Sequence, residues 1–411
     1  MDSQGSQSRP QSLRILIVST FPPALGTSAG AARVFEVARG VSRHHTVDIL
    51  SFIDTVDDRK HISALKVFCR SVDTILRTRT PLAGDLLGMQ PTQFVTEYSD
   101  STMAQEIQQR VSSGRYDLVQ FEFLQTAWLM PKDCPIPSLL THHEVQHAVC
   151  IQRMNLSKTL IERASHFINW MRVLHWELEI CSRFSAVITV TPDDAARISK
   201  YLSRPKIRVN RTGVDCAHYA PMDVIPLSNR LVFMGYYGHS PNVDAAEWLV
   251  REIMPLVWLR RPDVHVDLVG GGVIPKMHGL ATDSRVHITG WVEDYRPFVA
   301  RAIPLVPIRL GYGIRHKVLE AWAMGRPVIS TALGSAGTGA INGTNACIAD
   351  SAPDFANAII NLLDNRELQS QLGRNGRTHV LRNFDWPIIF GEHEDIYNNV
   401  MNEWRHGEHR P

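Results

Sequence analysis

Residues 311–331 read GYGIRHKVLEAWAMGRPVIST and combine four local patterns in a short space. Glycines and the cations Arg315 and Lys317 come first, and a strongly helical run that carries Glu320 follows. The sequence Gly-Arg-Pro at 325–327 then interrupts that run ahead of a β-branched stretch. This order predicts a loop, a helix, a tight turn and a strand. A glycine-containing cationic loop that leads into a helix is typical of a site that holds an anion.

The same alternation of strand and helix extends over most of the chain. Apolar, β-branched runs predict strands at residues 13–19, 46–52, 117–121, 138–141, 186–190, 230–235, 264–269, 286–289 and 327–331. Helical or loop-forming sequence separates these runs, which is typical of doubly wound parallel sheets. We therefore expect an α/β fold of two Rossmann-like doubly wound domains that face a central cleft, with ligands beyond the carboxyl ends of the strands.

The length of 411 residues supports two domains rather than one. The irregular segment 213–229, which contains two prolines, is the expected linker. We predict an N-terminal domain over residues 13–222 and a second domain over 223–385. The last segment, 386–411, is too short to form its own core and is predicted to be a helix that packs back on the first domain.

The overall composition is globular, with 44% hydrophobic and 20% charged residues and a formal charge of +2. This near-neutral balance gives no reason to expect a nucleic-acid partner. The six cysteines are dispersed, which argues against a zinc site and against a disulfide framework. The polar N-terminus lacks the pattern of a signal segment, and no apolar run reaches the length of a spanning helix, so a cytoplasmic, soluble or peripherally bound protein is expected.

One segment departs from this even charge. Residues 151–211 contain eleven Lys and Arg against five Asp and Glu. A solvated helix flank is the favoured interpretation, and a basic face for phosphates or an anionic membrane is the alternative. Within it, a helix is predicted over residues 160–183. We interpret its apolar stripe as core rather than as a membrane face; the stripe consists of Phe167, Trp170, Leu174, Leu178 and Cys181.

Two loops are candidates for binding phosphate. Residues 26–30 form a glycine loop between a strand and a helix, where backbone N–H groups could approach an anion, although a purely structural turn is an equal alternative. Arg309, Arg315 and Lys317 fall within nine positions of one another ahead of a helix, an arrangement that suits a diphosphate. Glu320, one turn later, could accept hydrogen bonds from a pair of sugar hydroxyls; the alternative is that it only complements the helix dipole.

These motifs carry a resemblance to a known family. The segments TGWVEDYRP and PIRLGYGIRHKVLEAWAMGRPVIST resemble the donor-binding domain of the retaining GT-B glycosyltransferases of group 1, family four, in the branch with a P-x-R-x-G-x-G-x-x-x-K-x-L-E-A motif. The segments FPPALGTSAGAARVFEVARGVSRHHTVDIL and GVDCAHYAP resemble that family's first glycine loop and pre-linker motif. The likeness extends over nearly the whole chain from Leu13, which would make residues 13–222 the acceptor side and 223–385 the nucleotide-sugar domain.

The resemblance also implies roles for individual residues. Arg309 and Lys317 would bind the donor diphosphate, with Arg315 beside them, and Glu320 would hold the nucleotide ribose. A histidine after a strand of the first domain would lie near the reacting face of the sugar, and here we favour His143, with a structural strand cap as the alternative. The remaining expected donor contacts are Gly30, Gly290, Trp291, Val292, Gly313 and Ile314.

The implied activity is transfer of a sugar from a nucleoside-diphosphate sugar to an acceptor hydroxyl with retention of anomeric configuration, without a metal or other cofactor. The acceptor would be a saccharide, a lipid-linked saccharide or a small molecule, and the protein would be cytoplasmic, with the inner face of a membrane as an open alternative. Tyr312 stands where many family members have a glutamate. A sugar-nucleotide epimerase of the same fold and a non-catalytic sugar-nucleotide-binding protein are the alternatives.

Overall fold

The computed structural model describes residues 12–78, 97–155, 157, 159–204, 206–311 and 313–407. The chain divides into two compact units, which are residues 1–211 with 390–411 (unit 1) and residues 212–389 (unit 2). The sequence prediction placed these divisions at 222/223 and 385/386. Each unit is an α/β domain, as predicted, and the central cleft stays a prediction.

The described residues of unit 1 form a seven-stranded parallel sheet in the order β3-β2-β1-β4-β5-β6-β7. Its strands are β1 (Arg14–Ser19), β2 (Thr46–Ile53), β3 (Ser71–Leu76), β4 (Leu118–Glu122), β5 (Ser138–His142), β6 (Ala186–Thr189) and β7 (Lys206–Val209). The central strand β1 is buried at every position after Arg14 because helices cover both faces of a parallel sheet. The order reverses between β1 and β4, which is where a doubly wound sheet opens a crevice at its carboxyl edge.

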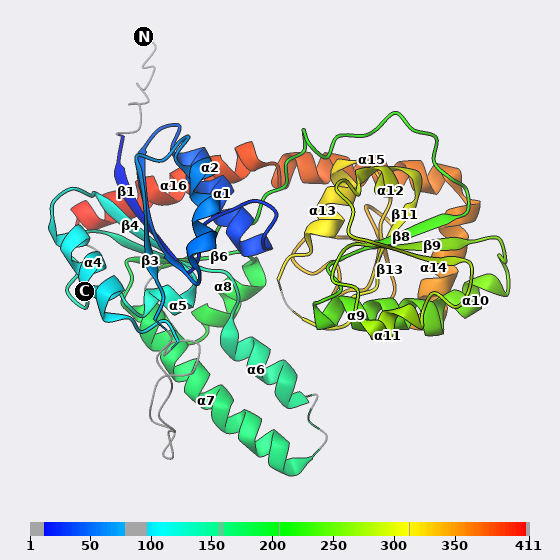
Figure 1. Cartoon of the computed structure of the whole chain (residues 1–411), viewed down its shortest axis with the longest axis horizontal. Coiled ribbons are helices and arrows are strands. Elements are labelled where there is room, and N and C mark those ends of the chain that lie inside the picture. The colour runs from blue at the N-terminus through cyan, green and yellow to red at the C-terminus, as the bar shows by residue number, and fades with distance from the viewer. Residues whose placement is uncertain are drawn as a thin grey trace, which may run out of the picture. The chain divides into compact units, whose positions relative to one another are not determined.

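Unit 2 repeats this plan with six described strands in the order β10-β9-β8-β11-β12-β13. They are β8 (Arg230–Met234), β9 (His265–Val269), β10 (Val286–Gly290), β11 (Ile303–Val306), β12 (Ile329–Ser330) and β13 (Cys347–Ile348). The order reverses between β8 and β11. Figure 1 shows helices on both sides of this sheet, with α9 and α11 on one side and α12 and α13 on the other.

The described helices of unit 1 lie between its strands in the chain. They are α1 (Ala29–Val41), the 3-10 helix η1 (Val56–His61), α2 (Ile62–Leu65), α4 (Ser101–Ser112), α5 (Leu124–Ala127), α6 (Gln146–Asn155), α7 (Leu160–Ser182) and α8 (Pro192–Ser199). Thr191 caps α8, because its side chain accepts a hydrogen bond from the backbone N–H of Asp194. Ser28 caps α1 in the same way through the N–H of Ala31.

Unit 2 contains α9 (Ser240–Trp248), the π-helical turn η2 (Leu249–Ile253), α10 (Met254–Trp258), α11 (Pro275–His278), α12 (Arg296–Arg301), α13 (His316–Ala323), α14 (Ala352–Asp364) and α15 (Arg366–Asn383). The last helix, α16 (Trp386–Arg405), begins in unit 2 and continues as part of unit 1. In the described part of the chain, no helix is both long enough and apolar enough to cross a lipid bilayer.

The interpretation of α7 as a core helix is wrong for its N-terminal half. Phe167, the first member of the predicted core stripe, is exposed, and Trp170 is only half-buried. The side chains that α7 does bury begin at Val173 and continue with Glu177, Ile180 and Cys181. The helix therefore extends beyond the part of unit 1 that it packs against.

Candidate functional site

The predicted donor residues of unit 2 lie on loops that follow the carboxyl ends of its strands. β8 ends at Met234 and β11 ends at Val306, on the two sides of the point where the strand order reverses. Arg309 follows β11, and the loop then leads into α13, which begins at His316. Tyr312 lies outside the described residues. The sequence thus places its main cationic cluster where a doubly wound sheet binds ligands.

Lys317 connects α13, which follows β11, with α9, which follows β8, on the two sides of the point where the strand order reverses. Its Nζ donates a hydrogen bond to Oδ1 of Asn242 at 3.0 Å, and Asn242 belongs to α9, the element after β8. The same ammonium lies 4.6 Å from the centre of the Phe233 ring. Burial and the positive charge of Arg315 together lower the pKa of Lys317 to about 7, against the opposing charge of Glu320. The amine is half-buried, and an anion bound beside it would favour its charged form.

Glu320 lies one turn further along α13 beside two phenols. Burial raises the pKa of Glu320 to about 7, against the hydrogen bond from Tyr295 and the charge of Lys317. The hydroxyl groups of Tyr295 and Tyr219 are 2.6 Å apart. A half-buried carboxyl group of this kind can accept hydrogen bonds from ligand hydroxyls that replace water. The geometry is compatible with the predicted ribose contact, which stays a prediction.

Arg309 is already paired within unit 2. Its Nη2 lies 2.9 Å from Oδ1 of Asp244, its Nε donates to Oδ2 at 3.2 Å, and its guanidinium stacks 4.8 Å from the Trp248 ring centre. Arg315 is the N-cap residue of α13, and its Nη2 donates to the carbonyl oxygen of Leu310 at 3.2 Å. These bonds brace the loop between β11 and α13. Because Asp244 already binds the guanidinium of Arg309, a diphosphate at Arg309 would share that group with Asp244.

The other predicted donor residues lie on two loops whose glycines adopt left-handed backbone. Gly290 ends β10 with φ of +70°, and Gly313 has φ of +80°, a region that L side chains rarely adopt. Trp291 is 77% exposed, whereas Val292 and Ile314 pack against the core of unit 2. An exposed tryptophan beside a glycine is free to stack on a planar ligand, so the predicted base contact is sterically open at Trp291.

In unit 1, His143 directly follows β5 and forms a close pair with a buried carboxylate. Its Nε2 lies 2.6 Å from Oε2 of Glu122, and its ring stacks on Phe123 with centres 3.8 Å apart. Burial lowers the pKa of His143, although Glu122 opposes this. Burial also acts to raise the pKa of Glu122, but His143 and Arg33 hold it below its ordinary value. The pair therefore fixes the orientation of the imidazole, as a carboxylate does for a catalytic histidine.

Close packing beside the His143–Glu122 pair requires a glycine at position 30. A Cβ added at Gly30 would lie 2.8 Å from Cζ of Phe123, nearer than real Cβ contacts. Phe123 itself has φ of +75°, an unusual conformation for a residue with a side chain. Phe21 packs on the same ring at 4.8 Å between centres. Gly30 is thus brought close to His143 through Phe123. It lies in the first turn of α1, whereas the sequence prediction placed residues 26–30 in the loop before that helix.

A buried polar network that the sequence analysis missed holds Glu122 in place. Gln120 donates from Nε2 to Oε1 of Glu122, and the Thr141 hydroxyl donates to the same oxygen at 3.1 Å. Two residues of α16 complete the network. The Tyr397 hydroxyl donates to Oε1 of Gln120 at 2.6 Å, and Nε2 of His393 lies 3.1 Å from that oxygen. The sequence feature that could have indicated this network is the pair of polar residues Gln120 and Glu122 at the end of a buried strand.

The two residues that flank His143 in the chain have other surroundings. His142 is buried, with Nε2 2.8 Å from Oε1 of Glu177 in α7. Glu177 also lies 2.6 Å from Nδ1 of His147 and accepts the backbone N–H of Gln146 at 2.7 Å, so it secures the start of α6. Glu144 is exposed. His142 therefore belongs to a packing cluster, and His143 is the histidine that remains partly accessible.

No group of three or more His, Cys, Asp and Glu side chains is arranged to hold a metal ion within the described residues. Metal independence nevertheless stays a prediction.

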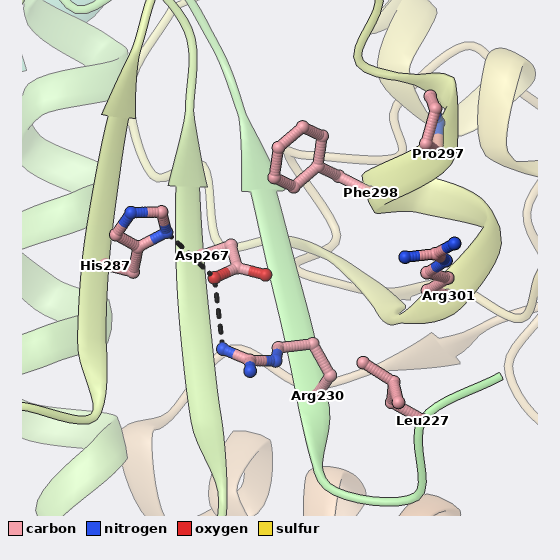
Figure 2. A pocket seen from close by; sticks show the side chains of 7 residues that line it. All are labelled: Leu227, Arg230, Asp267, His287, Pro297, Phe298 and Arg301. Carbon is pink, nitrogen blue, oxygen red and sulfur yellow. Dashed lines mark hydrogen bonds and ion pairs between the residues drawn. The ribbon is translucent and has the colours of Figure 1, made fainter.

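A separate pocket of about 260 Å³ lies on the face of the unit 2 sheet that α12 covers (Figure 2). Its lining contains none of the predicted site residues; it consists of Leu227, Arg230, Asp267, His287, Pro297, Phe298 and Arg301. At its centre Asp267 lies 3.2 Å from Arg230 and 3.5 Å from His287.

This chain is similar to proteins that are named glycosyltransferases. Residues 228–365 match the model of the family described as glycosyl transferases group 1. A lipopolysaccharide core biosynthesis glycosyltransferase, LpsE, of Rhizobium meliloti is 32% identical over 137 residues, which are 32% of this chain and 40% of the relative. A GDP-mannose-dependent phosphatidylinositol monomannoside mannosyltransferase of Corynebacterium glutamicum is 28% identical over 215 residues, 46% of this chain and 56% of the relative. The chain thus spans about half the length of these curated relatives.

Solved structures are similar over nearly the whole chain. Sucrose-phosphate synthase from Thermosynechococcus elongatus has a TM-score of 0.69 at 17% identity, covering 95% of this chain and 99% of that one. Anabaena Alr3699/HepE in complex with UDP has a TM-score of 0.67 at 15% identity, covering 94% and 100%. At such identities the likeness shows the fold alone, and that fold is GT-B, as the sequence predicted.

Proposed function

We propose that this chain is a glycosyltransferase that moves a sugar from a nucleoside-diphosphate sugar to an acceptor hydroxyl, with retention of anomeric configuration and without a metal. The observation that carries the proposal is the Lys317–Asn242 hydrogen bond across the reversal point of the unit 2 sheet, with Glu320 one turn away. The family match over residues 228–365 supports it, as do relatives that are named glycosyltransferases.

The chemistry follows from the charges on this edge. The bond from the anomeric carbon to the diphosphate breaks, and the leaving group gains negative charge in the transition state. Lys317, Arg315 and the N-terminus of α13 are fixed positive partners for that charge, and a partner fixed in advance need not reorganise during the reaction. In a retaining reaction of this kind, the departing phosphate oxygen takes the proton of the acceptor hydroxyl.

The His143–Glu122 pair is the candidate contribution of unit 1. A buried carboxylate holds the imidazole at Nε2, which leaves Nδ1 as the atom that could meet a substrate hydroxyl. We assign His143 to substrate binding at the sugar, and Glu122 to positioning His143. The cytoplasmic location and the absence of a further cofactor are part of the same proposal. HepE has been crystallised with UDP, which makes a uridine donor the first to test.

The two alternatives are not favoured. Epimerisation and passive nucleotide-sugar binding fit the fold equally well, but the matched family and both relatives carry transferase names. Incubation with donor alone distinguishes an epimerase from a glycosyltransferase, because an epimerase would form an epimer without any acceptor. A glycosyltransferase would release nucleoside diphosphate faster when its acceptor is present.

A thermal-shift screen with UDP, GDP, ADP and dTDP tests the donor site. A ligand that binds only the folded protein at 100 times its Kd adds about 2.7 kcal/mol of stability, so one diphosphate should raise the Tm by several degrees. Lys317→Ala should remove that shift. Lys276→Ala, which removes an exposed unit 2 lysine paired with Glu247, should keep it. If none of the four raises the Tm, or if Lys317→Ala responds like the wild type, the proposal fails.

A further inference from the structure

The N-terminal half of α7 projects beyond the core of unit 1. The buried side chains of this helix begin at Val173, and none of residues 160–172, all of which the structure describes, is buried. Figure 1 shows α6 and α7 extending together away from the sheet of unit 1. The sulfur of Cys150 in α6 accepts a hydrogen bond from the Asn169 side chain at 3.5 Å, which ties the two helices together along one side. Within the described residues of unit 1, the opposite side of this half of α7 stays exposed.

That uncovered side carries a continuous apolar stripe. Six exposed residues recur at helical spacing; they are Leu160, Ile161, Ala164, Phe167, Ile168 and Met171, here called the α7 stripe. Leu160 is 85% and Ile161 84% exposed. At 100° per residue the six positions fall within an arc of about 120°, the width of an apolar face that normally meets a partner. Isolated exposed apolar residues are ordinary, but a stripe of three helical turns is not.

The sequence that contains the stripe is rich in cations. Residues 151–172 contain Arg153, Lys158, Arg163 and Arg172 against the single acid Glu162. Arg163 is exposed and lies next to the stripe on the helical wheel. The whole chain, in contrast, has a formal charge of only +2. A helix with an apolar face and basic flanks has the pattern of a segment that lies in the plane of a membrane surface.

We propose that the α7 stripe docks this protein on an anionic lipid surface. The stripe would enter the headgroup region, and the flanking cations would meet lipid phosphates. A second copy of the chain fits less well, because two stripes brought together would also bring together two sets of like charges. The inference is independent of the proposed glycosyl transfer, since it rests on α7 alone and its readout needs neither donor nor acceptor.

Vesicle co-sedimentation of the full chain tests this docking. The protein should bind vesicles of mixed phosphatidylglycerol and phosphatidylcholine more strongly than vesicles of phosphatidylcholine alone. The double variant Ile161→Asp/Ile168→Asp should reduce the partition coefficient at least about tenfold, because two charges enter the apolar arc. Arg163→Gln should reduce it roughly fivefold on anionic vesicles and little on neutral ones, since one cation near such a surface adds about that factor.

Val67→Asp is the matched control. Val67 is also in unit 1 and is 84% exposed, but it lies outside α7, so the variant adds a charge without touching the stripe and should bind like the wild type. Circular dichroism and the Tm of each variant check that it folds. The proposal is overturned if the wild type ignores anionic vesicles, or if the double variant binds them as the wild type does. It is equally overturned if the wild type forms a dimer that the double variant abolishes and shows no lipid binding.

Discussion

Binding of a nucleoside diphosphate should be coupled to protonation of Lys317. Its pKa is about 7 in the free protein, so roughly half of the molecules carry a neutral amine at pH 7. A bound diphosphate favours the ammonium form and should return the pKa toward its ordinary value of 10.5. Binding then takes up a proton, and affinity must fall as pH rises above 7.

The size of the effect follows from these two pKa values. With about 7 in the free protein and about 10.5 in the complex, the association constant should fall roughly 50-fold between pH 7 and pH 9. Proton uptake should be about half a proton at pH 7 and close to one at pH 9. Lys317→Arg provides the comparison, because a guanidinium stays charged over this range and should flatten the dependence. Glu320 and the ligand titrate in both proteins, so the difference between them isolates Lys317.

Isothermal titration calorimetry with the diphosphate selected by thermal shift provides the measurement. Titrations at pH 7, 8 and 9 in two buffers with different ionisation enthalpies give both the affinity and the number of protons taken up. Equal pH slopes in the wild type and in Lys317→Arg, with both proteins folded by their Tm, would refute the reasoning. Lys317 would then not be the group that meets the diphosphate.

Two further predictions concern stability and packing. Glu320→Gln should stabilise the ligand-free protein by about 3 kcal/mol at pH 8 and weaken nucleotide binding. The pKa of Glu320 is about 7 when folded against an ordinary value of 4.5, so the folded state loses stability as pH rises from 4.5 to about 7, and the gain from the variant should vanish near pH 4.5; urea unfolding at both pH values measures this. Gly30→Ala should lower the transfer rate at least about tenfold, because its Cβ displaces the Phe123 ring that supports His143. Gly391→Ala, where nothing lies within 4 Å, should retain the wild-type rate; unchanged activity in Gly30→Ala would contradict this view of Phe123.

The sequence predicted most strands inside both sheets and the edge strand β10, but it missed the inner strand β11 and the edge strands β3, β7 and β13. β1 and β9 appear as apolar runs because no position after the first meets water. The edge strands β3 and β7 consist mostly of exposed and half-buried positions, so their letters are mixed and give no continuous run. β13 has only two residues. These strands form because a neighbouring strand offers hydrogen bonds to their backbone. The local sequence gives no sign of that neighbour.

For the donor site, the sequence by itself determined which cations gather ahead of α13, because loop, helix start and charge lie within a few residues. Only the tertiary structure decided what those groups contact. Asn242, which contacts Lys317, comes from α9, and Tyr295, which contacts Glu320, precedes α12. The partner of His143 is Glu122, which Tyr397 from the far end of the chain holds through Gln120. Residues that folding brings together from distant parts of the sequence have no fixed spacing in it, so no motif indicates that they will be in contact. The α7 stripe differs again, because its letters suit a core as well as a surface and only the extent of the packed core shows that it is exposed.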